Sequence, residues 1–117
     1  MQDSNRSTAG SDGDAVVAFN YRGRDFKIFG AGSNDHVFKL IAKVRGFYEI
    51  DLLEYMLHIR DFIGGDGTVS VDIGANIGNH SLFFASFLTS HVISIEPNPV
   101  VLPLLKANLQ ALSLIHI

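Results

Sequence analysis

The sequence predicts an α/β fold with an open parallel sheet, of which only the first part is present. A β-branched apolar segment at 68–73 is followed by a glycine-flanked loop, an apolar helical segment and a second short strand at 91–95. Strands that alternate with helices form parallel sheets joined by right-handed crossovers. An acidic residue accompanies the end of each strand, Asp72 in the first and Glu96 after the second. We therefore expect about the first two core strands of such a sheet, preceded by a β-hairpin and two helices.

The composition is that of a folded, weakly acidic protein. The chain has 117 residues, a hydrophobic fraction of 47% and a formal net charge of −3. Because binding along a nucleic acid needs clustered Lys and Arg, we expect no nucleic-acid partner. No apolar run is long enough to span a membrane, and the chain start lacks the basic and apolar regions of a secretory signal. The absence of cysteine excludes disulfides and thiolate metal sites and fits a cytoplasmic protein.

The chain is expected to begin with a tail and a hairpin. Residues 1–14 are rich in Ser, Asp, Asn and Gly without apolar periodicity, which predicts a disordered tail. Alternating apolar residues on both sides of Arg22-Gly23-Arg24 predict a β-hairpin over 15–29.

Two helices complete the N-terminal segment, which we assign to 15–67. Capping residues that end at Asp35 start a short amphipathic helix, and Gly46 is its predicted stop. A second helix is predicted over 49–62, and the glycine-rich stretch 64–67 predicts a break after it.

Residues 68–111 are predicted to start the functional domain. The strand 68–73 has the composition of a strand buried at the centre of a sheet. The helix 79–88 is expected to pack its phenylalanines on that sheet.

A last helix is expected after Asn98, with Pro99 in its first turn. Pro103 conflicts with a regular helix there, because proline lacks a backbone donor, so the helix should kink or begin later.

The final residues, 112–117, allow two interpretations. Leu114 to Ile117 has a strand-like composition where a third strand would be due. The string also equals the translation of a common sequencing adaptor, which favours a non-native tail, and we exclude it from functional reasoning.

The loop between the two strands fits the demands of S-adenosylmethionine. Gly74 and Gly78 lack a Cβ, so the cofactor could lie against the backbone. Asp72 could accept hydrogen bonds or face the ammonium group of the cofactor, and the helix start near Gly78 offers free N–H groups to its carboxylate. Glu96 could accept both ribose hydroxyls.

A nicotinamide-binding fold is the rival interpretation. Its G-x-G-x-x-G fingerprint would need glycine at Asn76 and at Asn79, so two of the three glycines are missing. A plain structural turn, with Asp72 and Asn76 acting only as turn formers, is a further alternative.

The residues resemble a known family. VDIGANIGNHSLFFA, followed by VISIEPNPVVLPLLKANL, is similar to the FkbM family of class I S-adenosylmethionine-dependent methyltransferases, and the similarity covers about 35–108. The D-[IV]-G-A-N-x-G-N-H core and the E-P-N-P segment are specific to that group, and Phe47-Tyr48-Glu49 is also similar. The resemblance implies a Rossmann-like sheet of seven strands. It also implies S-adenosylmethionine as donor and O-methylation of a hydroxyl, often on a sugar or natural product.

The resemblance also implies which residues contact the cofactor. These are Asp72, Gly74, Ala75, Asn76, Gly78, Asn79, Glu96, Asn98 and Glu49. No catalytic residue and no metal ligand follows from it. His80, alone among the histidines, stands beside the loop, where a structural role is favoured over a role in the active site.

The chain departs from the family by stopping after two of the expected core strands. The later strands, which would supply the rest of the adenine pocket and the acceptor site, are missing. Three hypotheses follow: the cofactor-binding part of an O-methyltransferase, part of a nicotinamide-dependent oxidoreductase, or an incomplete domain without activity.

Overall fold

The computed structural model describes residues 15–63 and 65–116; the predicted tail at 1–14 lies outside them. The N-terminal elements are β1 (Ala15–Tyr21), β2 (Arg24–Gly30), η1 (Gly32–Asn34), α2 (His36–Val44), α3 (Ile50–His58) and α4 (Arg60–Ile63). The C-terminal elements are β3 (Gly65–Ile73), α5 (Asn79–Phe83), the π-helical η2 (Phe84–Leu88), β4 (Thr89–Ile95) and α6 (Leu102–His116). None of the described helices is long and apolar enough to cross a membrane.

The described strands form two separate two-stranded sheets. The hairpin β1–β2 is antiparallel, and Val17 pairs with Ile28. Strands β3 and β4 are parallel, with Val71 opposite Ile93. Both pairings were predicted from the sequence, and together they make a small α/β structure compatible with an incomplete α/β domain.

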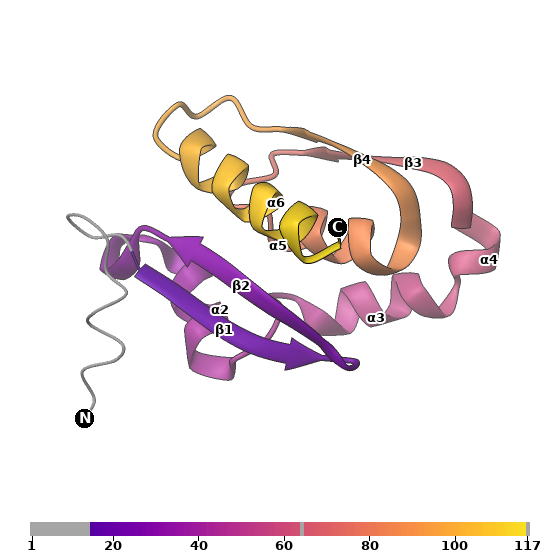
Figure 1. The fold of residues 1–117 in the computed structure, drawn as a ribbon, viewed down its shortest axis with the longest axis horizontal. Coiled ribbons are helices and arrows are strands. Elements are labelled where there is room, and N and C mark those ends of the chain that lie inside the picture. Colours follow the sequence, from indigo (N-terminus) through magenta and orange to yellow (C-terminus); the bar gives the residue numbers. More distant parts are fainter. Residues whose placement is uncertain (1–14, 64, 117) are drawn as a thin grey trace.

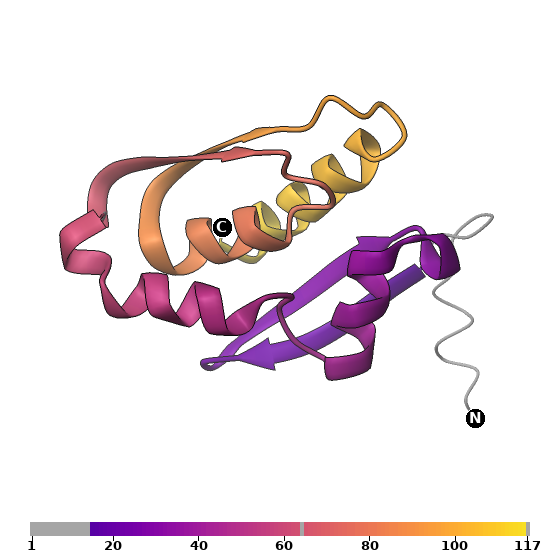
Figure 2. The ribbon, with the colours of Figure 1, turned by 180° about the vertical axis from the view of Figure 1, so that it is seen from behind.

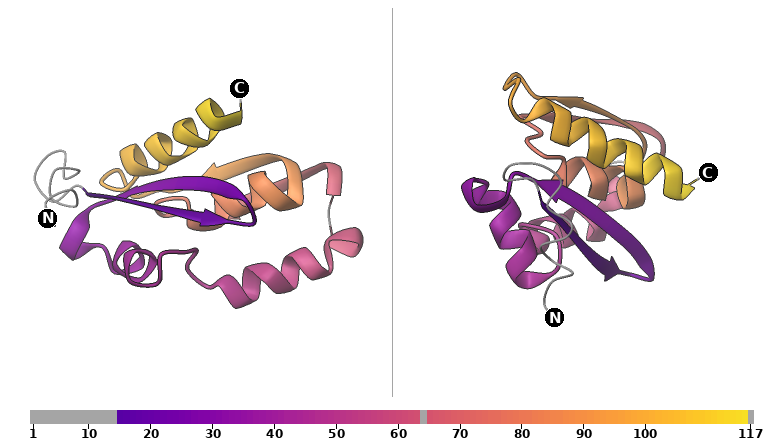
Figure 3. Two further views of the ribbon diagram at one scale, coloured as in Figure 1. Left: turned by 60° about the horizontal axis from the view of Figure 1, so that its bottom comes forward. Right: turned by 60° about the vertical axis from the view of Figure 1, so that its left-hand side comes forward.

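The elements lie in layers. In Figure 1 and in the opposite view of Figure 2, α5 and α6 lie between the β3–β4 pair and the hairpin. The two views of Figure 3 place α2 on the side of the hairpin that faces away from α6. One face of the parallel pair is therefore covered by helices, and the other carries no element of the described chain.

An aromatic cluster joins the hairpin to the helices. Phe47, which follows α2, lies at its centre, and its ring centroid is 4.9 Å from Phe26 and 5.3 Å from Phe83. Edge-to-face pairs at such distances each contribute about 0.5–1.5 kcal/mol beyond the burial of their area. Phe83 is fully buried, as expected for this helix. Its ring contacts are with Tyr21, Phe47 and Phe87 on the side of the hairpin, whereas the sequence predicted packing on the parallel strands.

The helices largely follow their local signals. Asp35 caps α2, since its Oδ1 accepts a hydrogen bond from Phe38 N at 3.0 Å. The helix predicted over 49–62 is instead divided at Ile59, whose backbone leaves the helical region with φ −100° and ψ 18°. The expectation of one continuous helix was therefore wrong at that point.

The first parallel strand differs from its prediction in start and burial. It begins at Gly65, inside the stretch predicted as a break, and its pairing is irregular between Gly65 and Val69. Its side chains alternate in exposure, and Val71 and Ile73 are 53% and 78% exposed. The expected fully buried strand is thus half exposed, because within the described chain only one face meets helices.

The last helix begins later in the chain than its predicted capping residue, Asn98, would place it. Asn98 caps a turn through Val101, and α6 starts at Leu102. Pro103 therefore falls in the first turn, where backbone N–H groups have no intrahelical partner and none is lost. The helix continues through His116, so the alternative of a third strand near the chain end was wrong, and Leu112 is buried in the core.

Candidate functional site

The glycine loop is tied to the end of β4. Backbone N–H groups of Gly74 and Ala75 both donate to the carbonyl of Ile95, at 2.8 and 3.0 Å. Asn76 adopts a left-handed backbone with φ 55°, which asparagine tolerates better than most residues. The loop is therefore held at the carboxyl ends of both strands, where α/β sheets place their ligand sites.

The two loop glycines do different things. Gly74 has φ +75°, and a Cβ built there would meet no atom within 4 Å. Gly78 has φ +101°, and its Cβ would lie 3.0 Å from Leu105 Cδ1. We expected a Cβ at either position to obstruct a cofactor. At Gly78 the obstacle is the end of the Leu105 side chain on α6, so this glycine serves helix packing, while Gly74 faces open space.

Glu96 links the loop to the segment after β4. Its Oε1 accepts a hydrogen bond from Asn76 N at 2.6 Å, and its Oε2 accepts one from Asn98 N at 3.0 Å. The carboxylate is therefore oriented by two backbone donors from both sides. Three of the predicted cofactor residues come together here.

Asp72 faces the helix layer. The residue is 8% exposed, and its Oδ2 accepts a hydrogen bond from Ser81 Oγ at 2.6 Å. Ser81 Oγ also lies 2.6 Å from Ser94 Oγ, so this hydroxyl joins β3, α5 and β4. The hydrogen bond that Asp72 accepts here comes from the chain's own helix α5, and its predicted contact with a cofactor stays a prediction. Ser81 itself was missed, because a lone serine in a helix carries no sequence signal.

Asn79 anchors the start of α3. Its side chain is buried, and it accepts from Tyr48 N and donates to Tyr48 O, both at 2.8 Å. This clamp holds the residue next to Glu49, which adopts a left-handed backbone with φ 58° and ψ 43°. Such a conformation costs a non-glycine residue about 1–2 kcal/mol and persists only where its surroundings impose it.

His80 lies against Glu49. Its Nε2 is 3.1 Å from Glu49 Oε1, but Nε2 is shielded from solvent and has no aligned hydrogen-bond partner among the described residues. The imidazole stacks between Tyr48 and Phe84, with ring centroids 6.5 and 6.1 Å away. The structure thus brings Glu49 close to Asn79 and His80, two consecutive residues that are distant from it in the chain.

Asn108 closes the helix side of the loop. This fully buried side chain donates to the carbonyls of Ile77 and Phe29, at 2.6 and 3.0 Å, and accepts from Phe29 N at 2.6 Å. It therefore fastens both the loop and the hairpin to α6. The sequence carried no signal for this contact beyond a polar residue on an apolar helix.

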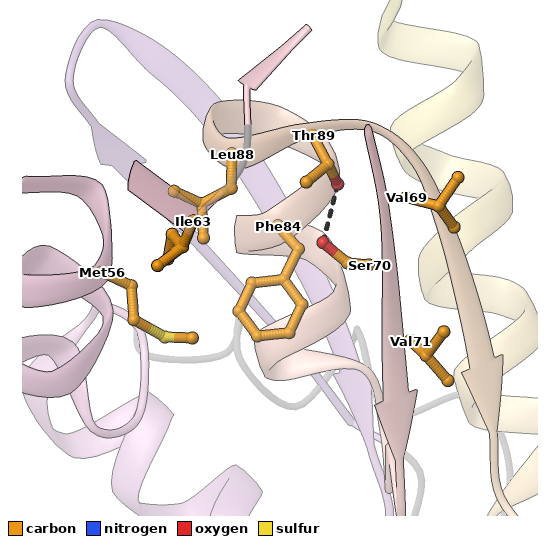
Figure 4. Close-up of a pocket in the computed structure, with 8 residues that line it drawn as sticks. All are labelled: Met56, Ile63, Val69, Ser70, Val71, Phe84, Leu88 and Thr89. Atoms are coloured by element: carbon orange, nitrogen blue, oxygen red, sulfur yellow. Dashed lines mark hydrogen bonds between the residues drawn. The ribbon is translucent and has the colours of Figure 1, made fainter. Parts of the chain in front are cut away.

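Two cavities flank these elements. One, of about 360 Å³, borders the loop and is lined in part by Asn76, Asn98 and His36. The other, of about 270 Å³, lies along β3 and is drawn in Figure 4, where Met56 and Phe84 form its apolar wall. The second cavity contains none of the predicted site residues, so only the first adjoins the candidate site.

No family model matches the chain, and no curated protein matches it. Among solved structures, the chain is similar to a Pyrococcus horikoshii protein described as "putative transferase PH0793", with a TM-score of 0.50 and 21% sequence identity. The similarity covers 89% of this chain and 34% of that protein, so this chain spans about a third of its neighbour's length. At this identity the likeness concerns the fold, and the fold is one that a protein described as a transferase also has.

Proposed function

We propose that this chain forms the S-adenosylmethionine-binding part of an O-methyltransferase of FkbM type. The acceptor is a hydroxyl on a sugar or another small natural product. The observation that carries the proposal is the Glu96 carboxylate, set by Asn76 N and Asn98 N at the end of β4 beside the glycine loop. The motif resemblance and the α/β arrangement of the elements support it.

The residues present fit the cofactor. A carboxylate has about four acceptor sites, and the two backbone bonds to Glu96 leave one on each oxygen for the two ribose hydroxyls. Gly74 faces space in which a ligand could approach the backbone. Ala75 and Asn76 continue the same loop, and Asp72 steadies it through Ser81.

The cofactor supplies an electrophilic methyl group on its sulfonium. The residues of this chain bind and orient it: Glu96 at the ribose, and the loop from Gly74 to Gly78 along its length. Asn98 sets the second Glu96 oxygen and starts the turn before α6.

Calorimetry on a soluble polypeptide that contains this chain tests the proposal. S-adenosylhomocysteine, the demethylated product, should bind, and NAD should bind far more weakly. Preferential binding of NAD would instead support the oxidoreductase hypothesis and overturn ours.

Replacing Glu96, the proposed hydrogen-bond acceptor for the ribose hydroxyls, tests the site itself. Glu96→Ala should weaken binding of S-adenosylhomocysteine by about 1.5–3 kcal/mol, the scale of lost hydrogen bonds to a charged group. Asp61→Asn, on the exposed surface of α4, is the matched control and should leave affinity unchanged. Because Glu96 also holds the loop, thermal unfolding of the unliganded variant must be measured beside it. Unchanged affinity in Glu96→Ala would show that Glu96 does not hold the ribose.

A further inference from the structure

The cavity along β3 contains no residue of the glycine loop, and apart from two hydroxyls its described lining is apolar (Figure 4). Met56 comes from α3, Ile63 from α4 and Phe84 from η2, so helical elements and the parallel pair together border about 270 Å³. An apolar cavity of about 150 Å³ accommodates benzene, so this one has room for a ligand of roughly six to ten carbon atoms.

The two hydroxyls of this cavity form a pair that can only accept. Ser70 Oγ and Thr89 Oγ1 are 2.7 Å apart, and Thr89 Oγ1 also donates to the carbonyl of His91 at 3.0 Å. A hydroxyl has a single proton, and the carbonyl takes that of Thr89, so Ser70 must donate the bond between the two hydroxyls. Neither hydroxyl keeps a proton, while Ser70 Oγ keeps its lone pairs. The pair can therefore accept a hydrogen bond from a ligand but cannot donate one.

The helical turn beside this pair is irregular. In η2 the wide π turn is closed by Thr89 N, which donates to the carbonyl of Phe84 five residues earlier. Phe84, Leu88 and Thr89 consequently line the same cavity. Turns of this kind are rare, and they occur frequently at functional sites. The irregular backbone and the accepting hydroxyl pair thus coincide at one cavity.

We propose that this cavity binds a small uncharged alcohol, whose apolar body lies against Met56 and Phe84 and whose hydroxyl donates to Ser70 Oγ. An ammonium donor would be a poor ligand, because no described residue of the lining is charged and the cation would lose its hydration without gaining a counterion. A thioether beside a ring suits an apolar or aromatic body. The site is separate from the proposed cofactor site and does not depend on the proposed function.

Three probes of similar shape test the chemistry of the site: benzyl alcohol, its methyl ether and benzylamine. In a soluble polypeptide that contains this chain, NMR of isotope-labelled methionine methyl groups reports binding at Met56, and Met56→Leu assigns the signal. Benzyl alcohol should shift this signal until the site is saturated. The ether, which has no proton to donate, should bind about fivefold more weakly, the scale of one neutral hydrogen bond, and the protonated amine more weakly still.

Two variants test the hydrogen-bond assignment. Ser70→Ala removes the acceptor, so benzyl alcohol should bind about fivefold more weakly while the ether stays within about twofold. Thr89→Val removes the hydroxyl to which Ser70 donates and frees the Ser70 proton, so the ether should bind more tightly than it does to the unaltered protein. Ser90→Ala, at an exposed position of β4 outside the cavity, is the matched control and should change neither affinity.

The outcomes decide the assignment. Equal affinities for the alcohol and the ether in the unaltered protein would overturn it, and so would a preference for the alcohol that persists in Ser70→Ala. If Ser70→Ala does not fold, an ether affinity that stays unchanged in Thr89→Val would overturn it instead. A Met56 signal that none of the probes shifts would show that this cavity takes no such ligand.

Discussion

At the residue scale, the two loop glycines share a left-handed backbone but differ in what a side chain would meet. A Cβ on Gly74 points into open space, and one on Gly78 lies 3.0 Å from Leu105. Gly74 therefore leaves room for a ligand, and Gly78 leaves room for helix α6.

This difference predicts opposite effects of substitution. Gly74→Ala should cost only backbone strain, about 1–2 kcal/mol of unfolding free energy, and should weaken S-adenosylhomocysteine binding. Gly78→Val should cost about 3 kcal/mol or more, because overpacking against α6 adds to the strain. Denaturant unfolding and calorimetry on both variants check this. Equal stabilities of the two variants would contradict the assigned roles.

Asn108 is a single residue that holds two elements together. Its amide satisfies both backbone groups of Phe29 and the carbonyl of Ile77 at a fully buried position. Asn108→Ala should lower the free energy of unfolding by about 2 kcal/mol or more, because buried backbone groups lose their partners. Denaturant unfolding measures it, with Gln110→Ala on the exposed side of α6 as the control. A loss no larger than that of the control would show that the amide bonds are dispensable.

At the element scale, the parallel pair has two unlike faces. Ser70, Asp72 and Ser94 lie on the side of α5 and η2, while Val71, Ile73 and Ile93 point away and are exposed. Parallel sheets are covered on both faces in folded α/β proteins, so an exposed apolar face marks surface that such a fold would bury.

Polar substitutions on that exposed apolar face should therefore raise the solubility of the chain. The double variant Val71→Thr and Ile93→Thr should raise the soluble yield of the 117-residue chain, because neither side chain is buried in the core. Ile77→Thr, a change of the same kind at a fully buried position, should lower the yield instead. Expression followed by centrifugation measures both. An unchanged or reduced yield in the double variant would show that this face does not drive aggregation.

At the scale of the whole molecule, the hairpin and the helices share a core to which the parallel pair adds no buried apolar side chain among the described residues. The pair also keeps two edges without a strand partner in the described chain. Unpaired edges beside an apolar face template aggregation. We expect the 117-residue chain alone to be insoluble or molten and to bind S-adenosylhomocysteine weakly or not at all. Size-exclusion chromatography, near-UV circular dichroism and calorimetry test this. A soluble monomer with a cooperative thermal transition and measurable affinity would show it wrong.

The sequence by itself determined the features whose signals are local. Alternation predicted the hairpin, Asp35 predicted the start of α2, and the strand–loop–helix–strand order placed the glycine loop and Glu96 together at the strand ends. Pro103 predicted either a kink in the last helix or a later start, and the later start is the one observed, at Leu102. Each of these signals depends on neighbours a few residues away, which a sequence displays directly.

Only the tertiary structure decided which distant groups meet. It turned Asp72 toward Ser81, placed Leu105 against Gly78, and brought Glu49 beside His80 through the Asn79 clamp. No periodic pattern and no fixed spacing in the sequence marks these contacts, because each depends on how helices and strands pack after they form. The same holds for burial: composition marked the first strand as apolar, but the number of layers around it decided that one of its faces stays exposed.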